Sequence, residues 1–168
     1  MAFKKTSETI AVSFGLTETA PSTFIQDEIA LQLDILNNEI FVVLAVDMDL
    51  DAPDAIAGVD TSVSASVTST SQLTLATLAN TNTITNSSEA IRAAGFVDGG
   101  VAFSRGATST YTGDVDYIAL IATNNFFVQL VTQGNPGLKA LSGRVWGYRA
   151  RADSATYAAL VQSEVLSA

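Results

Sequence analysis

The stretch IALQLDILNNEIFVVLAV, residues 29–46, alternates apolar with other side chains on both sides of Asn37-Asn38. A period of two is typical of a β-strand that buries one face. Paired asparagines suit a two-residue hairpin turn, because Asn tolerates positive φ. Folding at that turn pairs residues 29–35 with residues 40–46 and places one apolar set on one face. A slip of one residue would move that set into water, so the stretch predicts a β-hairpin of defined register.

A second stretch has the same pattern. Residues 118–123 run into Asn124-Asn125 and continue as residues 126–133, which predicts a second hairpin. Weaker alternation or β-branched content predicts further strands at residues 9–19, 62–70, 72–78, 96–103 and 141–151. Residues 79–88 show no apolar periodicity and are expected to form a long exposed loop.

Helix is predicted in two short places. Residues 88–94 can form about two turns, with Gly95 as the C-terminal cap. Near the end of the chain, Asp153 or Ser154 can cap a helix over residues 155–166. One side of this second helix would carry the apolar residues Tyr157, Leu160, Val161 and Val165.

Strands joined by turns, with almost no helix between them, predict an all-β fold. Their number and spacing indicate an antiparallel β-sandwich or barrel of about eight strands with a short C-terminal helix. We expect a single domain over residues 1–168, with an N-terminal arm at residues 1–8 and a helical tail at residues 153–168. A chain of this length buries roughly 70% of its unfolded surface and needs no disulfide or metal to fold.

The composition excludes several chemistries. The 168 residues include no histidine and no cysteine, so histidine-based triads, histidine-ligated metals and thiol chemistry are absent. No Gly-rich phosphate loop is present, and no stretch approaches the ~18 apolar residues of a membrane span. We therefore expect no enzymatic activity, no resident cofactor and no transmembrane segment.

The charge is concentrated at one end of the sequence. Residues 1–60 carry eleven acids and only two bases, Lys4 and Lys5, whereas residues 61–168 are balanced with six of each. An acidic surface of this kind repels nucleic acid and anionic lipid. The pattern therefore disfavours direct nucleic-acid binding and favours a soluble acidic surface.

Four aspartates are the one arrangement that resembles a metal site: Asp47, Asp49, Asp51 and Asp54. Calcium takes several oxygen ligands, and the first spacing matches the start of an EF-hand loop. The match then fails, because Ala52 replaces the required glycine and Gly58 the bidentate glutamate. A bound calcium and a solvated strand face are the two alternatives. Asp114 and Asp116 could form a glycosidase pair, but such pairs are common in any acidic protein.

One basic and aromatic cluster lies near the C-terminus, made of Arg144, Trp146, Tyr148, Arg149 and Arg151. Residues of these types dominate contact hot spots and also stack on bases or sugars. Alternatively, Trp146 fills the core while the arginines meet the acidic first third of the chain. We expect a charge-complementary contact, within or between subunits.

The whole pattern resembles viral coat proteins of the single jelly-roll kind. The resemblance rests on the two Asn-Asn hairpins, the Ser/Thr-rich residues 61–88 and the closing strand Gly143-Arg-Val-Trp-Gly-Tyr-Arg-Ala-Arg151. It implies a jelly-roll-like sandwich whose copies assemble laterally into a capsid shell. It also implies synthesis in the host cytoplasm without a signal peptide, location in the virion, and other virion proteins as partners. The chain departs from many coats in lacking a polybasic arm.

Apolar residues on the expected wet faces of strands also favour self-assembly. Phe126 and Phe127 are adjacent, and Phe41 lies opposite the apolar set of the first hairpin. Such groups must be covered by a second layer or by a neighbouring copy. These three phenylalanines therefore join the basic and aromatic cluster as candidate subunit contacts. The alternatives are an extracellular filament or surface-layer subunit, and a carbohydrate-binding module or hydrolase.

Overall fold

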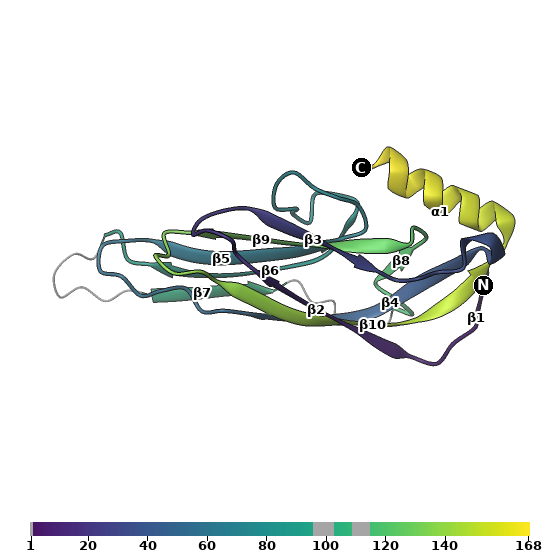
Figure 1. Cartoon of the computed structure of the whole chain (residues 1–168), viewed down its shortest axis with the longest axis horizontal. Helices are drawn as coiled ribbons and strands as arrows, with labels where there is room; N and C mark the ends of the chain where they lie inside the picture. Colours follow the sequence, from purple (N-terminus) through teal and green to yellow (C-terminus); the bar gives the residue numbers. More distant parts are fainter. Residues whose placement is uncertain (1, 96–102, 109–114) are drawn as a thin grey trace.

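The structure, a computed structural model, describes residues 2–95, 103–108 and 115–168. These residues form ten strands, one short 3-10 turn at Ile35–Asn37 and one C-terminal helix (Figure 1). The strands are β1 (Phe3–Lys5), β2 (Ile10–Thr17), β3 (Ile25–Ala30), β4 (Glu39–Leu50), β5 (Thr61–Thr68), β6 (Thr83–Arg92), β7 (Phe103–Thr108), β8 (Ala119–Ile121), β9 (Asn125–Gln133) and β10 (Ala140–Ala152), and the helix is α1 (Ser154–Leu166).

The strands form two antiparallel sheets of five. In the first sheet, β1 and β2 pair along one side of β10, and β4 and then β8 follow on its other side. In the second sheet the order is β3, β9, β5, β6 and β7. The sheets lie face to face, so the all-β sandwich expected from the sequence is confirmed (Figure 1).

The connectivity is that of a jelly roll. Strands from the first half of the chain pair with strands from the second half in reverse order: β2 with β10, β3 with β9, β4 with β8 and β5 with β6. Such a folded-over double strand gives two Greek keys and two packed sheets. The reverse-order pairing also decides what happens at the two Asn-Asn segments.

Both predicted hairpins are wrong in their pairing. The first turn is present, because Asn38 has a left-handed backbone with φ 55°. However, β3 ends at Ala30 and pairs with β9 in the second sheet, whereas β4 belongs to the first sheet. The second segment likewise separates β8 in the first sheet from β9 in the second. At each Asn-Asn turn the chain therefore crosses from one sheet to the other. Such a crossing shows the same sequence pattern as a hairpin, with two asparagines between two apolar segments.

Several other expectations are settled. The strands expected at 9–19, 62–70 and 141–151 are present as β2, β5 and β10, and Asp153 caps α1 as expected. The helix at 88–94 is wrong, because residues 83–92 form β6, and this strand also shortens the loop expected at 79–88. Residues 72–78 form no strand, and residues 3–5 of the expected arm form β1. The strand expected at 96–103 lies almost entirely outside the described residues.

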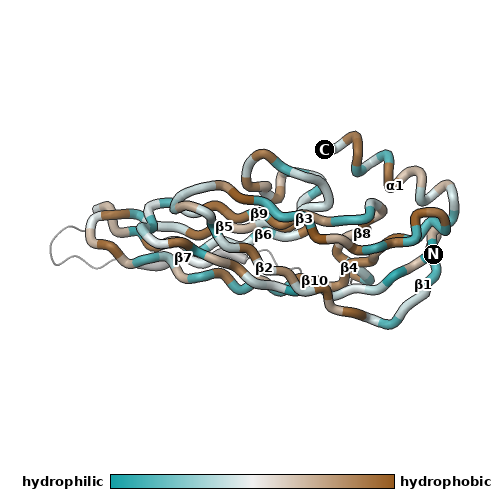
Figure 2. Tube along the Cα trace, in the orientation of Figure 1, coloured by the Kyte–Doolittle hydropathy of each residue, from teal (hydrophilic) through white to brown (hydrophobic). Residues whose placement is uncertain are grey.

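The strand β4 is buried on both faces. Phe41 and Val43 point into the core between the sheets, together with Phe14 of β2 and Phe126 of β9. Ile40 and Val42, on the opposite face, belong to a second apolar cluster beneath α1. Apolar positions accordingly recur along the strands and again on α1 (Figure 2).

Two glycines of β10 make room for the aromatic core. A Cβ at Gly143 would lie 2.5 Å from the ring of Phe14, and one at Gly147 would lie 2.6 Å from the ring of Phe41. Each Cβ would lie closer still to a carbonyl oxygen of β4, that of Asp47 for Gly143 and that of Val42 for Gly147. Real side chains do not approach this closely, so any larger residue would displace the backbone of β4 as well as an aromatic ring of the core. The glycines in the closing strand are therefore a packing requirement of this sandwich.

Candidate functional site

The helix α1 covers part of the outer face of the first sheet. Tyr157, Leu160 and Val161 pack on the cluster that contains Ile40 and Val42. Asp153 begins the helix by accepting a hydrogen bond from the Thr156 amide at 2.7 Å. This bond lowers the pKa of the Asp153 carboxyl. In the part of the chain that the structure describes, no helix is long and apolar enough to cross a membrane.

Glu164 is the only charged residue of α1, and it is buried with 6% of its surface exposed. Its carboxylate accepts hydrogen bonds from the Ala122 amide at 2.8 Å and the Thr123 amide at 3.1 Å. Burial raises the pKa of the Glu164 carboxyl, although these bonds oppose the shift. The Tyr157 hydroxyl nearby also has a raised pKa, first through burial and then through the charge of Glu164. The helix end is thereby fixed to the connection between β8 and β9.

The excursion between β5 and β6, residues 69–82, lies over a polar outer face of the second sheet. Ser66, Thr68 and Gln129 are completely buried there. The Gln129 side chain donates to Thr68 Oγ1 at 2.7 Å and accepts from Ser66 Oγ at 2.7 Å. The Ala76 amide of the excursion donates to Ser66 Oγ at 3.3 Å. The Ser/Thr-rich sequence is therefore a layer of hydrogen-bonded polar groups that the excursion covers.

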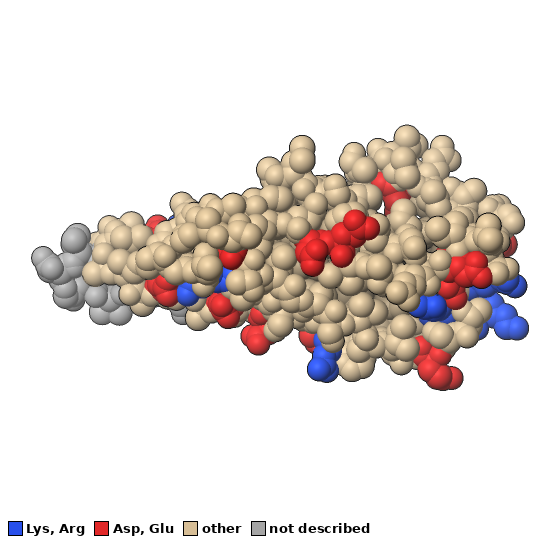
Figure 3. Space-filling model, in the orientation of Figure 1, with Lys and Arg blue, Asp and Glu red and all other residues tan. Residues whose placement is uncertain are grey.

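The excursion and α1 together form a surface without exposed charge. The sequence contains no charged residue between Asp60 and Glu89, and the only charge of α1 is buried. The two segments meet where Asn82 Nδ2 donates to the Glu164 carbonyl at 3.5 Å. We call residues 69–82 and the exposed side of α1 the uncharged face (Figure 3, upper edge). Four apolar residues on this face are each between 62% and 93% exposed: Leu73, Leu78, Val165 and Leu166.

The structure corrects two of the predicted subunit contacts. Phe41 and Phe126 have no exposed surface, because both point into the core between the sheets. The sequence argument failed because α1 covers the other face of β4, so this strand needs no neighbouring copy. Phe127 points away from that core and is partly exposed.

The arginines near the C-terminus bind segments of the first third of the same chain. Arg149 Nη2 donates to the Leu31 carbonyl at 2.9 Å, and Arg149 lies 3.8 Å from Glu39. Arg151 Nε donates to the Asn37 carbonyl at 3.0 Å. These contacts hold the crossing between β3 and β4 against β10. The charge-complementary contact expected from the sequence exists within the chain at Arg149, which faces Glu39, whereas Arg151 binds the uncharged Asn37.

Arg144 and Trp146 lie on the outer face of the first sheet, away from α1. The Trp146 indole N–H donates to Asp47 Oδ2 at 2.8 Å. An open depression beside this pair is lined by Ser13, Asp47, Asp49, Ser142 and Arg144. Tyr148, in contrast, packs at the edge of the cluster under α1, with Lys5 Nζ 4.8 Å from its ring centre.

The four aspartates do not form a calcium site. Asp47 binds Trp146, Asp51 accepts from the Ala140 amide at 2.9 Å, and Asp54 Oδ1 lies 2.8 Å from Lys139 Nζ. Among the described residues no group of three or more acidic side chains converges on one point. The strand geometry accounts for this, because alternate residues of β4 are too far apart to share an ion. Asp114 lies outside the described residues, so the predicted carboxylate pair is not placed.

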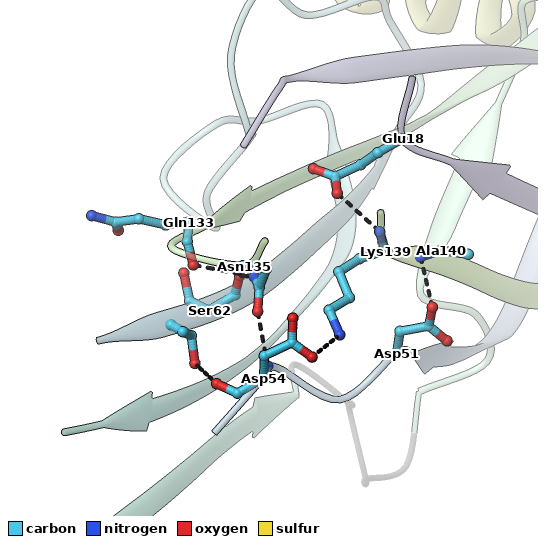
Figure 4. A network of polar contacts seen from close by, with 9 residues as sticks. Glu18, Asp51, Asp54, Ser62, Gln133, Asn135, Lys139 and Ala140 are labelled. Atoms are coloured by element: carbon cyan, nitrogen blue, oxygen red, sulfur yellow. Dashed lines mark hydrogen bonds and ion pairs between the residues drawn. The ribbon is translucent and has the colours of Figure 1, made fainter. Parts of the chain in front are cut away.

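A polar network that the sequence did not indicate joins three loops at one end of the sandwich (Figure 4). Glu18, which is 2% exposed, accepts from Thr132 Oγ1 at 2.6 Å and from the Lys139 amide at 3.0 Å. Asn135 accepts from the Asp54 amide at 2.9 Å and donates to the Ser62 carbonyl at 2.9 Å. The network satisfies buried polar groups and fixes the loops, which is a structural role.

The described residues offer two candidate binding surfaces, the uncharged face and the depression beside Trp146. Neither presents a nucleophile with an adjacent base, or a set of metal ligands. The chain matches no protein-family model, no curated protein and no solved structure, so its function has to be inferred from its own residues.

Proposed function

We propose that this chain is a structural subunit of a virion, a coat protein that assembles with copies of itself into a shell. The jelly roll is the fold of many viral capsid domains, and it also occurs in lectin domains and cupins. Fold alone does not select among these, because unrelated functions share it. The uncharged face is the observation that favours assembly.

The uncharged face has the composition of the centre of a protein interface. Interface centres are depleted of charged residues, and contiguous exposed apolar groups mark interaction sites. Here Leu73 and Leu78 on the excursion, and Val165 and Leu166 on α1, lie on adjacent segments with no exposed charge among them. An acidic chain with net charge −9 has solvated acids elsewhere, whereas the one acid of these two segments, Glu164, is only 6% exposed. A surface that binds identical copies accounts for it.

The net charge sets the conditions for assembly. Copies with a charge of −9 repel each other, and salt weakens this repulsion. At ~1 M salt the screening length falls to ~3 Å, which leaves contact-range interactions as the main term. We therefore expect assembly to increase with salt concentration.

Negative-stain microscopy and sedimentation velocity of the purified protein, at low and at ~1 M salt, test the proposal. We expect closed particles that become rarer in Leu166→Glu, because a charge at the centre of an interface is costly to bury. Leu36→Glu is the matched control, since Leu36 is 95% exposed on the crossing between β3 and β4, outside the uncharged face. Rods would favour the filament alternative, and monomers under all conditions would refute the proposal.

A second candidate is carbohydrate binding at the depression beside Trp146. An indole with neighbouring carboxylate and hydroxyl groups is the type of surface on which a sugar ring stacks and forms hydrogen bonds. Asp47 and Ser142 line the depression, and Trp146 adjoins it through its hydrogen bond to Asp47. Quenching or shift of the fluorescence of Trp146, the single tryptophan, on titration with a panel of oligosaccharides would support this candidate. Unchanged fluorescence across the panel would count against it.

A further inference from the structure

We propose that two copies of this chain pair through the free edge of β2, which would extend the first sheet from one molecule into the next. The inference rests on the proposed function for its partner, a second copy, and adds a specific contact to it. Among the described strands, β2 pairs only with β10, so its other side is a sheet edge. A sheet edge presents unpaired N–H and C=O groups to any strand that can reach them.

The register identifies the backbone groups that face outward. The Glu18 amide donates to the Lys139 carbonyl at 3.0 Å, and the ladder continues with Thr17 opposite Ala140. In an antiparallel ladder the residues of a strand face its partner alternately. The backbone N–H and C=O groups of Val12, Phe14 and Leu16 therefore bond to β10. The residues that present their N–H and C=O groups to the free edge are Ala11, Ser13, Gly15 and Thr17.

These four residues are well suited to accept another strand. All four are exposed and small, so no side chain obstructs an approaching backbone. Their side chains lie on the outer face of the sheet, because Val12, Phe14 and Leu16 point into the core. Pairing at this edge would leave the core of each copy unchanged.

The edge also lacks the features that usually prevent such pairing. Exposed edge strands normally carry charges, prolines or bulges that keep other strands away. Between Glu8 and Glu18 the sequence has no charged residue and no proline. The edge strand β3 of the second sheet provides the contrast, because Asp27 and Glu28 lie at its centre. An antiparallel pair of β3 strands would place acids opposite acids, which is unfavourable, so the edge at β3 is protected and the edge at β2 is not.

A two-fold axis between two β2 strands gives an antiparallel pair in which every outward-facing residue has a partner. Ser13 of one copy then lies opposite Gly15 of the other, and Ala11 opposite Thr17. This register joins outward-facing residues to each other, as a hydrogen-bonded pair requires. The contact is self-complementary, which is the condition for a closed dimer. Such a dimer could be the building block of the larger shell.

Sedimentation equilibrium of the full chain at ~1 M salt, with four variants, tests the pairing. Ser13→Pro removes an outward N–H, which proline tolerates on an edge strand, and should raise the dimer dissociation constant at least ~10-fold. Ser13→Lys places two like charges diagonally across the two-fold axis, and it should raise the dissociation constant more at ~0.1 M than at ~1 M salt, because salt screens the repulsion. Ser13→Thr keeps the N–H and should dimerise as the native chain does. Ser142→Lys adds the same charge on β10, the strand behind the β2 edge, where Ser142 is exposed opposite Gly15. Because this lysine does not lie at the proposed contact, the variant should also dimerise.

Hydrogen exchange followed by NMR gives an independent measurement that does not depend on variants. Dilution from dimer to monomer should accelerate exchange at Ala11, Ser13, Gly15 and Thr17 and leave the amides that face β10 unchanged. If Ser13→Pro loses its folded circular dichroism spectrum, Ser13→Lys and the exchange data decide.

The outcomes separate this inference from the proposed function. If the native chain forms particles or dimers and both Ser13→Pro and Ser13→Lys do so equally well, the β2 contact is wrong while self-assembly stands. A native chain that forms dimers through β2 but no larger particle supports the contact and refutes the shell. A monomer at every concentration overturns both.

Discussion

Replacing Glu164 by glutamine should change the pH dependence of stability in a defined direction. The carboxylate of Glu164 is buried and bonded to the amides of Ala122 and Thr123. Burial raises its pKa above the ordinary value of 4.5, so the folded state binds a proton more readily than the unfolded state does. The resulting stability is fully present below pH 4.5 and is lost as pH rises through the folded-state pKa. Glutamine does not titrate and lacks this dependence.

The size of the effect has an upper limit. One titrating group changes the free energy of unfolding by at most ~1.4 kcal/mol per pH unit. For a chain of this length ~1 kcal/mol corresponds to ~2–4 °C in Tm, so the limit is ~3–6 °C per pH unit. Glutamine also replaces one carboxylate oxygen by an NH2 group, which leaves one buried amide without its acceptor and costs ~1–3 kcal/mol at every pH. The Tm of the variant minus the native Tm should therefore start negative in acid and rise as pH increases.

Differential scanning calorimetry between about pH 4 and pH 8 measures this difference, and Glu8→Gln provides the control. Glu8 is exposed, so its replacement changes the charge of the chain by the same amount without altering the contacts of α1. If the native chain instead gained stability relative to Glu164→Gln as pH rose, the two amide bonds would outweigh burial. The sign of the pKa shift, and the view that α1 is docked at a cost in charge burial, would then be wrong.

Three further substitutions test the packing. Asp153→Ala removes the cap of α1 and should lower the Tm while the strand signal in circular dichroism stays unchanged. Gly143→Ala forces a methyl group against the Asp47 carbonyl of β4 and the Phe14 ring and should cost at least ~1–3 kcal/mol in urea titration, whereas Gly137→Ala, with open space around it, should be nearly neutral. Glu18→Ala leaves the Lys139 amide and Thr132 hydroxyl without an acceptor and should cost ~2 kcal/mol or more; a loss under ~0.5 kcal/mol would show that the network is dispensable.

Strands and caps could be predicted from the sequence because their signals are local. Alternation located β2, β5 and β10, and a single aspartate located the start of α1. Strand pairing could not be predicted in this way. Asn38 adopts the left-handed conformation that a hairpin turn needs, yet the chain leaves one sheet and enters the other around it. The pattern of residues 29–35 was still informative, because Leu31 and Leu33 are buried outside any strand.

The polar sites could not be predicted because their partners are distant in the sequence. Glu18 lies 114 residues from Thr132, and Glu164 lies 42 residues from Ala122. A buried acid looks the same in the sequence as a solvated one, so the sequence does not distinguish Glu18 or Glu164 from a surface charge. Conversely, Phe41 looked like a residue on a wet face because the sequence does not say that α1 covers the other side of β4.

The two faces of α1 couple the stability of the subunit to its surface. The inner side of the helix covers Ile40 and Val42, which would otherwise be an exposed apolar patch on the first sheet. The outer side carries Val165 and Leu166 on the uncharged face. A change that lifts the helix therefore exposes a core face at the same time as it removes the proposed contact face. Non-specific aggregation would follow, and ordered assembly would not. Substitutions confined to the outer side, such as Leu166→Glu, leave the inner contacts in place, so a loss of particles in such a variant reports on the contact between copies and not on folding.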